Sequence, residues 1–206
     1  MVSTQNQEYF IPSVIGLSIL ESLNGSIGKN GLVAILNQAN LSSLIGDSHE
    51  SNFSQNFDFS KISTIFMAVE EIYGSRGGKG LVFRAGRDVF NNYLKTYGVY
   101  NIVGKTEFSE LPELVKIKFG LNIFAKVFNF VSDQITNAKE INNTHYLTIH
   151  RCPYCWDRFN EDEPICSFAS GLIKESLKWI SGGIEYKVYE SQCIASGDEV
   201  CEFRII

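Results

Sequence analysis

The sequence predicts an α+β domain in which N-terminal helices pack on an antiparallel β-sheet. Three observations support this class. Apolar residues recur at helical spacing through most of the N-terminal two thirds of the chain. After Asn142 the period changes to the alternation of apolar and polar residues that is typical of strands. The order predicted from there is strand, helix, strand and strand, which favours an antiparallel sheet.

Glycine-rich or polar breaks separate the predicted N-terminal helices. Gly28 is expected to interrupt the first helical pattern, and Asp58 or Ser60 to cap the helix that follows a polar loop over 42–59. The glycine-rich stretch 74–80 is expected to be a flexible turn. Phenylalanines crowd the longest helix, so it is expected to be buried on most sides. The expected helices are 11–23, 32–39, 61–73, 81–97 and 112–138.

The C-terminal part predicts three strands and one helix. The first strand is rich in β-branched residues, and Gly182-Gly183 marks a turn before the second. In the last strand, Phe203 and Ile205 share one face. The strands are expected at 145–151, 184–190 and 201–206, and the helix at 165–180.

Composition limits the function classes. A chain of 206 residues suits one domain, and 44% hydrophobic residues supply a core. A net charge of −5 without any run of basic residues argues against nucleic acid as a partner. The first ten residues lack the pattern of a secretory signal, and no apolar stretch is long enough to span a membrane. We therefore expect the cytoplasm, or the periphery of a membrane.

All five cysteines lie in the last quarter of the chain, and an odd number favours reduced thiols over a disulfide framework. Glu190 and Cys193 flank a strand end, and a tight turn at 197–198 would return Cys201 to their side. Cys166, at the start of the preceding helix, would supply a fourth ligand. Thiolates with one carboxylate suit tetrahedral zinc, so these four residues predict a zinc site. The alternative is that the cysteines are small buried apolar residues.

A second cysteine pair, Cys152 and Cys155, follows the first predicted strand. The pair could donate alternative ligands to the zinc cluster. It could also be a redox pair, but that role requires the N-terminus of a helix in a βαβ unit, and the sequence after the pair predicts a loop. A third alternative is a loop with two thiols and no metal.

The aromatic content points to a ligand pocket, although aromatic side chains also fill ordinary cores. Arg84 and Arg87 lie one helical turn apart and could bind a ligand carboxylate, while Gly86 would allow a close backbone approach. His145 and His150 face opposite sides of a strand, and one of them could ligate a metal-bearing tetrapyrrole or simply pack. The candidate ligand-binding residues are Arg84, Arg87, Phe90, Phe124, Phe128, His150 and Trp156.

The C-terminal motifs resemble a known family. The helix that starts at Ile165-Cys166, followed by Glu190-x-x-Cys193-x-Ala-x-Gly-Asp-x-x-Cys201-x-Phe, is similar to the 4-vinyl reductase family of hydrocarbon-binding domains over about residues 80–206. The resemblance implies the fold of transport protein particle (TRAPP) subunits, an apolar channel and a dimer formed through N-terminal helices. It also implies zinc on Cys166, Glu190, Cys193 and Cys201, although the interval from Cys166 to Glu190 is one residue longer here.

The resemblance leads us to expect a single domain over 1–206, with a dimerising helical part at 1–60 and a ligand-binding core at 80–206. Relatives in photosynthetic bacteria imply a tetrapyrrole ligand and a role in pigment delivery to an assembling photosystem complex. The expected function is therefore non-enzymatic binding by a homodimer. Reduction of a tetrapyrrole vinyl group is one alternative, although no dinucleotide fingerprint is present. A scaffold with a lipid-filled channel is another.

Overall fold

The computed structural model of the chain describes residues 8–46, 55–92, 94 and 110–206. The predicted α+β class is confirmed, because helices and antiparallel sheets make up the described part. In chain order the elements are β1 (Phe10–Pro12), α1 (Ser13–Gln38), β2 (Gln55–Asp58), α2 (Phe59–Tyr73), α3 (Ser75–Asn92), α5 (Glu113–Val131), β3 (Ile135–Ile141), β4 (Thr144–Arg151), α6 (Ser167–Ile180), β5 (Val188–Gln192) and β6 (Cys201–Ile205).

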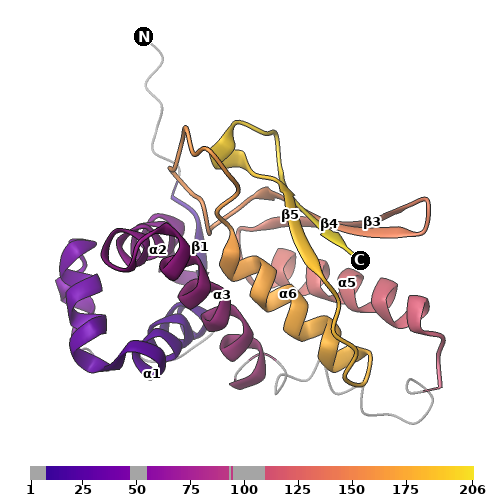
Figure 1. Cartoon of the computed structure of the whole chain (residues 1–206), viewed down its shortest axis with the longest axis horizontal. Helices are drawn as coiled ribbons and strands as arrows, with labels where there is room; N and C mark the ends of the chain where they lie inside the picture. The colour runs from indigo at the N-terminus through magenta and orange to yellow at the C-terminus, as the bar shows by residue number, and fades with distance from the viewer. Residues whose placement is uncertain (1–7, 47–54, 93, 95–109) are drawn as a thin grey trace.

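The strands form two antiparallel sheets. Strands β1 and β2 pair with each other, and the larger sheet has the order β3-β4-β6-β5. Figure 1 shows α1, α2 and α3 gathered on one side of the molecule, while α5 and α6 run along one face of the larger sheet. The inward-facing residues of β6 are the buried Cys201, Phe203 and Ile205, as the alternation predicts.

Local sequence explains most helix ends. Helix α1 contains a break at Gly28, whose φ of 76° is accessible to glycine at little cost, so the two predicted helices meet there at a kink. Asp58 caps α2, since its side chain accepts a hydrogen bond of 2.6 Å from the backbone N–H of Ser60. The expected loop over 42–59 is interrupted by the short strand β2, and β1 was likewise not predicted.

Two predictions about the middle of the chain are wrong. The stretch 74–80 is not a flexible turn, because only Gly74, with φ of 75°, leaves the helical conformation before α3 begins. The long helix predicted to residue 138 ends at Val131, and β3 follows it. The unrecognised signal was Asn142-Asn143, whose φ angles of 49° and 61° make the two-residue turn of a β-hairpin. Part of the helix predicted over 81–97 lies outside the described residues.

Helices α3 and α6 approach each other very closely in the core. A Cβ on Gly86 of α3 would overlap the backbone carbonyl oxygen of Phe168, and a Cβ on Gly171 of α6 would overlap that of Phe83. Gly86 was predicted to permit a close backbone approach, and the approach is to a neighbouring helix. Among the described helices, none combines the length and the apolar character that crossing a bilayer takes. The N-terminal helices and the α6 layer are thus joined through glycine contacts.

Candidate functional site

The structure brings all five cysteines and Glu190 into one cluster. Cys166 Sγ lies 3.6 Å from Cys152 Sγ, 3.9 Å from Cys193 Sγ and 3.7 Å from Cys201 Sγ. Cys155 Sγ lies 3.5 Å from Cys201 Sγ. All five thiols are buried, and none forms a disulfide. The four predicted zinc ligands are therefore together, and the pair whose role the sequence left open lies beside them.

Each donor is held by a different local structure. Cys166 stands at the N-cap of α6, and its backbone N–H donates a hydrogen bond of 2.7 Å to Glu190 Oε2. Cys193 begins a tight turn, in which its N–H donates to Asp198 Oδ2 at 2.8 Å and Gly197 has φ of 97°. This turn delivers Cys201 to the start of β6, where its sulfur accepts a bond of 3.4 Å from the N–H of Ile194. The cluster therefore links α6, β5 and β6.

The loop that carries Cys152 and Cys155 is anchored by an aromatic contact. Tyr154, between the two cysteines, is buried, and its ring centroid lies 5.0 Å from that of Phe168 in the first turn of α6. Phe66 of α2 stacks on the same phenylalanine at 5.4 Å. Because the anchor belongs to the helix that Cys166 caps, the loop and α6 hold their thiols together.

Burial sets the protonation of the cluster when no ion is present. It raises the pKa of the Cys152 thiol to about 11 and that of Cys166 well above its ordinary value. Burial, together with the charge of Cys193, also raises the pKa of Glu190 to about 9. Glu190 Oε1 has no hydrogen-bond partner among the described residues. A metal ion would have to displace protons from these groups, and it would give the unpartnered carboxylate oxygen a partner.

The donor set matches known metal chemistry. Two overlapping groups have all their ligand atoms within 4.8 Å of one another: Cys152, Cys155, Cys166 and Cys201 form one group, and Cys166, Glu190, Cys193 and Cys201 form the other. Thiolates with at most one carboxylate suit zinc and other thiophilic ions. The residues therefore fit a buried structural metal site, and the metal itself stays a prediction.

The predicted ligand-binding residues are spread over the molecule. Phe90 is buried against Trp179 of α6, with ring centroids 5.9 Å apart. Phe124 and Phe128 pack against each other on α5 at 4.6 Å. Trp156 packs edge-on against Tyr9, with a centroid distance of 5.1 Å. These aromatic side chains belong to or adjoin the apolar core, and they do not share one site.

The polar candidates are equally dispersed. Arg84 is exposed and lies 3.8 Å from Asp88 on its own helix. The Nε of Arg87 donates to Glu175 Oε2 of α6 at 2.6 Å. His150 is on the exposed side of β4, where its Nε2 lies 3.1 Å from Asn137 Nδ2. The two arginines therefore already have carboxylate partners within the protein.

Arg87 and Glu175 predict a pH-dependent contribution to stability. Hydrogen bonds from Asn91 and Arg87 outweigh burial and lower the pKa of Glu175. The ionised carboxylate therefore stabilises the fold at neutral pH, and this contribution is lost as pH falls through the lowered pKa. We expect Arg87→Met to cost about 1–3 kcal/mol at pH 7 in urea unfolding, and clearly less at pH 3. Arg84→Met, which breaks an exposed pair on the same helix, should change stability by less than about 0.5 kcal/mol.

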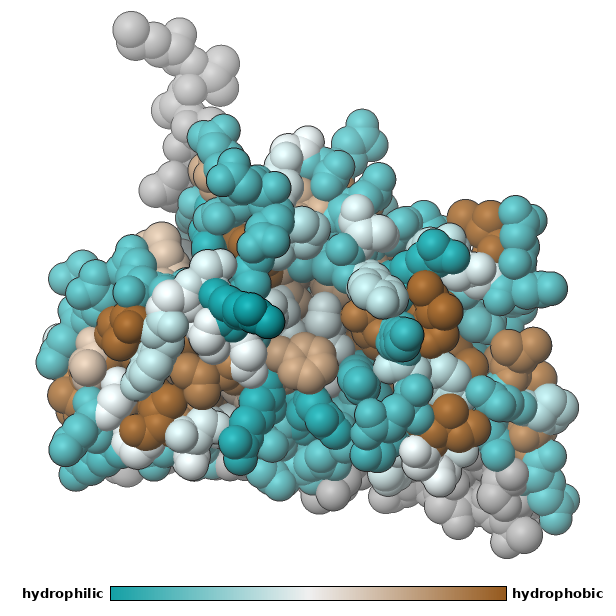
Figure 2. All heavy atoms as spheres, viewed as in Figure 1, coloured by the Kyte–Doolittle hydropathy of each residue, from teal (hydrophilic) through white to brown (hydrophobic). Residues whose placement is uncertain are grey.

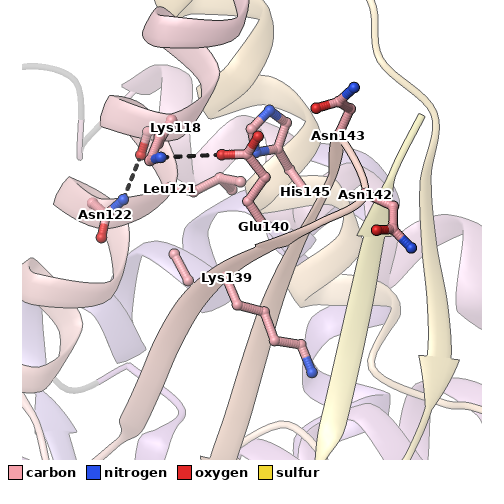
Figure 3. Close-up of a pocket in the computed structure, with 9 residues that line it drawn as sticks. Lys118, Leu121, Asn122, Lys139, Glu140, Asn142, Asn143 and His145 are labelled. Carbon is pink, nitrogen blue, oxygen red and sulfur yellow. Dashed lines mark hydrogen bonds and ion pairs between the residues drawn. The ribbon is translucent and has the colours of Figure 1, made fainter.

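A cavity of about 410 Å³ lies between α5 and the β3–β4 hairpin. In Figure 3, Lys118, Glu140 and His145 point toward one another there, and Lys139 points away. His145 is only 5% exposed, and its Nε2 has no partner in the described part of the chain. The cavity is lined by Lys118, Leu121, Asn122, Ala138, Lys139, Glu140, Asn142, Asn143 and His145.

The sequence did not predict this cavity. None of the predicted ligand-binding residues lines it, although His145 was considered beside His150. The wrong helix over 132–138 hid the hairpin that forms one wall. Recognition of the Asn142-Asn143 turn would have placed His145 opposite Glu140, its partner in the strand register.

Comparisons with solved structures show which fold this is. An H-NOX protein from S. oneidensis in the Fe(II)NO ligation state has a TM-score of 0.59 and 13% identity, covering 95% of this chain and 98% of its own. An H-NOX structure determined to probe heme distortion has a TM-score of 0.57 and 13% identity over 94% and 92% of the two chains. An oxygen-binding H-NOX domain related to soluble guanylate cyclases gives 0.53 and 14% over 94% and 92%. At such identities the likeness shows a shared fold.

Sequence comparisons single out the cysteine-bearing end of the chain. No curated protein sequence matches the chain. A family model does match, and it is that of the 4-vinyl reductase domain, over residues 145–206. This segment begins at β4 and holds every cysteine together with Glu190. The resemblance to the 4-vinyl reductase family is thus confirmed for residues 145–206, a domain of that family within a chain of H-NOX-like fold.

Proposed function

We propose that this chain binds, without catalysis, a small molecule that has an apolar body and polar edges, and that a tetrapyrrole is the ligand class to test first. The observation that carries the proposal is His145, a buried imidazole with an unpartnered Nε2 in the wall of a cavity of about 410 Å³. A buried polar atom without a partner costs about 1–3 kcal/mol. A ligand atom that meets this nitrogen would remove that cost.

The cavity lining indicates the chemistry of the ligand. Leu121 and Ala138 offer apolar surface, while the other lining residues are polar or charged. Lys118 donates to Glu140 at 3.1 Å and could instead reach a ligand carboxylate. Pockets for plain hydrocarbons are lined mainly by apolar side chains. The polar lining thus favours a tetrapyrrole with carboxylate groups over a bare hydrocarbon.

The comparisons support the same ligand class. The 4-vinyl reductase match covers β4, which carries His145, and the H-NOX neighbours include structures described by their heme or by bound NO and oxygen. Neutral imidazole is a common ligand of iron and zinc. A metal-bearing tetrapyrrole held through His145 agrees with both observations. Pigment delivery to a photosystem complex would be one use of such binding.

The second part of the proposed function is a structural zinc ion held by Cys166, Glu190, Cys193 and Cys201. The cluster lies away from the cavity lining, so the ion would stabilise the fold and take no part in ligand binding. By holding the first turn of α6 to β5 and β6, it would fix one side of the sheet whose opposite edge strand, β3, forms a cavity wall.

Titration of the purified chain with iron and zinc protoporphyrin tests the tetrapyrrole proposal. We expect a shift of the Soret band at micromolar concentrations, and His145→Ala should weaken binding at least about tenfold, because it removes the imidazole from the wall. His150→Ala is the matched control on the exposed side of the same strand and should bind normally. Equal binding by the wild type and both variants would reject His145 as a ligand.

Native mass spectrometry separates the remaining alternatives. The proposal predicts a pigment of tetrapyrrole mass, or an empty cavity that a tetrapyrrole fills, and the same spectrum reports whether the chain is a homodimer. A co-purified acyl lipid would favour the scaffold alternative. Turnover of a divinyl tetrapyrrole with NADPH would show that the domain is an enzyme and would overturn the non-catalytic part of the proposal.

A further inference from the structure

The cysteine cluster contains more donors than one metal ion can use. A zinc ion in a structural site takes four ligands in a tetrahedron. Six side chains, five cysteines and Glu190, present donor atoms in the cluster, and they divide into two groups of four. Cys166 and Cys201 belong to both groups. This sharing is the observation from which the inference starts.

The distances suit two tetrahedra that share an edge. Zinc–sulfur bonds of about 2.3 Å in a tetrahedron place neighbouring sulfurs about 3.8 Å apart. The shared pair, Cys166 and Cys201, has its sulfurs 3.7 Å apart. On one side of this edge, Cys152 and Cys155 lie 3.6 Å and 3.5 Å from one or other of the shared sulfurs. On the other side, Cys193 lies 3.9 Å from Cys166.

A single ion would leave buried donors unused. If the ion took Cys166, Glu190, Cys193 and Cys201, the thiols of Cys152 and Cys155 would remain in the interior, where they are only 1% and 2% exposed. If it took the four-cysteine group, the buried Glu190 Oε1 would keep no partner among the described residues. Unpartnered buried polar groups destabilise a fold. Two ions that share the central thiolates would use all six donors.

Charge also favours two ions. Four anionic ligands around one divalent ion leave two negative charges in a buried site. Five thiolates and one carboxylate around two divalent ions leave the same two charges, spread over more atoms. The desolvation cost per ion is therefore lower in the larger cluster. The loop of Cys152 and Cys155 is already fixed against α6 through Tyr154 and Phe168, so the second ion would need little further ordering of the chain.

We propose that the cluster holds two thiophilic divalent ions, such as zinc, bridged by the thiolates of Cys166 and Cys201. One ion is completed by Glu190 and Cys193, and the other by Cys152 and Cys155. The inference rests on the proposed zinc site, to which it adds a second ion and a role for the cysteine pair that the first site does not use. The second ion ties the β4–α6 loop to the same centre as α6, β5 and β6.

The test is the number of ions that the full chain binds and whether they share ligands. We expect two zinc ions per chain by native mass spectrometry of protein reconstituted under reducing, oxygen-free conditions. Substitution with ¹¹³Cd should give two NMR resonances that are scalar-coupled to each other through the bridging sulfurs. This measurement needs no variant, so a variant that fails to fold cannot obscure the result.

Two double variants assign the ions to their ligands. Cys152→Ser with Cys155→Ser should reduce the number from two ions to one, and Glu190→Gln with Cys193→Ser should do the same. One ion in the wild type that persists in the first variant would overturn the second site and leave the proposed zinc site standing. One ion lost only in the first variant would overturn both assignments, as would no ion at all. Iron with acid-labile sulfide would overturn the cluster of bare ions.

Discussion

Cys201→Ser is expected to release the metal and to lower the free energy of unfolding by about 4 kcal/mol or more, the range reached when a structural metal is lost. Cys201 belongs to both groups of donors, so its loss damages the site whichever group an ion uses. Metal content by mass spectrometry and urea unfolding of the purified chain would measure both effects. A chelator should bring the wild type down to the stability of the variant and leave the variant unchanged.

Ser196→Ala is the matched control for this prediction. Ser196 lies in the turn between Cys193 and Cys201, and its buried hydroxyl has no partner in the described part of the structure. Removing that hydroxyl deletes no metal ligand and no hydrogen bond, so stability should stay within about 0.5 kcal/mol of the wild type, or rise slightly. Full metal content and unchanged stability in Cys201→Ser would refute the metal site itself.

The cluster was largely predictable because its signals are local. The turn at Gly197 and the spacing from Cys193 to Cys201 lie within one short segment, and the family resemblance supplied Cys166 and Glu190. The contribution of Cys152 and Cys155 was left open for a physical reason. The direction of their loop depends on the packing of Tyr154 against Phe168, a contact that no periodicity in the sequence reveals.

The ligand site was less predictable, because the same residue types serve cores and pockets. Phe90 and Phe124 are fully packed core residues, and Arg87 is paired with Glu175 across two helices. Figure 2 shows a face on which apolar side chains are scattered among polar ones, so the surface marks no binding region either. The cavity follows from the hairpin register that sets His145 opposite Glu140, and pairing of this kind is a tertiary property.

Gly86→Ala carries the second large expected effect, and it acts on the contact between α3 and α6. In an ordinary helix interior the change would stabilise the protein by about 0.8–1 kcal/mol, because alanine is the better helix former. Here the new Cβ would overlap the carbonyl oxygen of Phe168, which is backbone and cannot rotate away. We expect a net loss of about 3 kcal/mol in the free energy of unfolding, the cost of forcing two packed helices apart.

Gly80→Ala, on the same helix, separates this effect from helix propensity. A Cβ at Gly80 meets nothing within 4 Å, so this variant should gain up to about 1 kcal/mol. The clash at Gly86 should also reach the metal cluster, since Phe168 lies in the first turn of α6, directly after the cap formed by Cys166. Weaker metal retention against a chelator in Gly86→Ala, with normal retention in Gly80→Ala, would show that the helix contact positions the thiol. Equal stability of the two variants would mean that α3 and α6 do not touch as described.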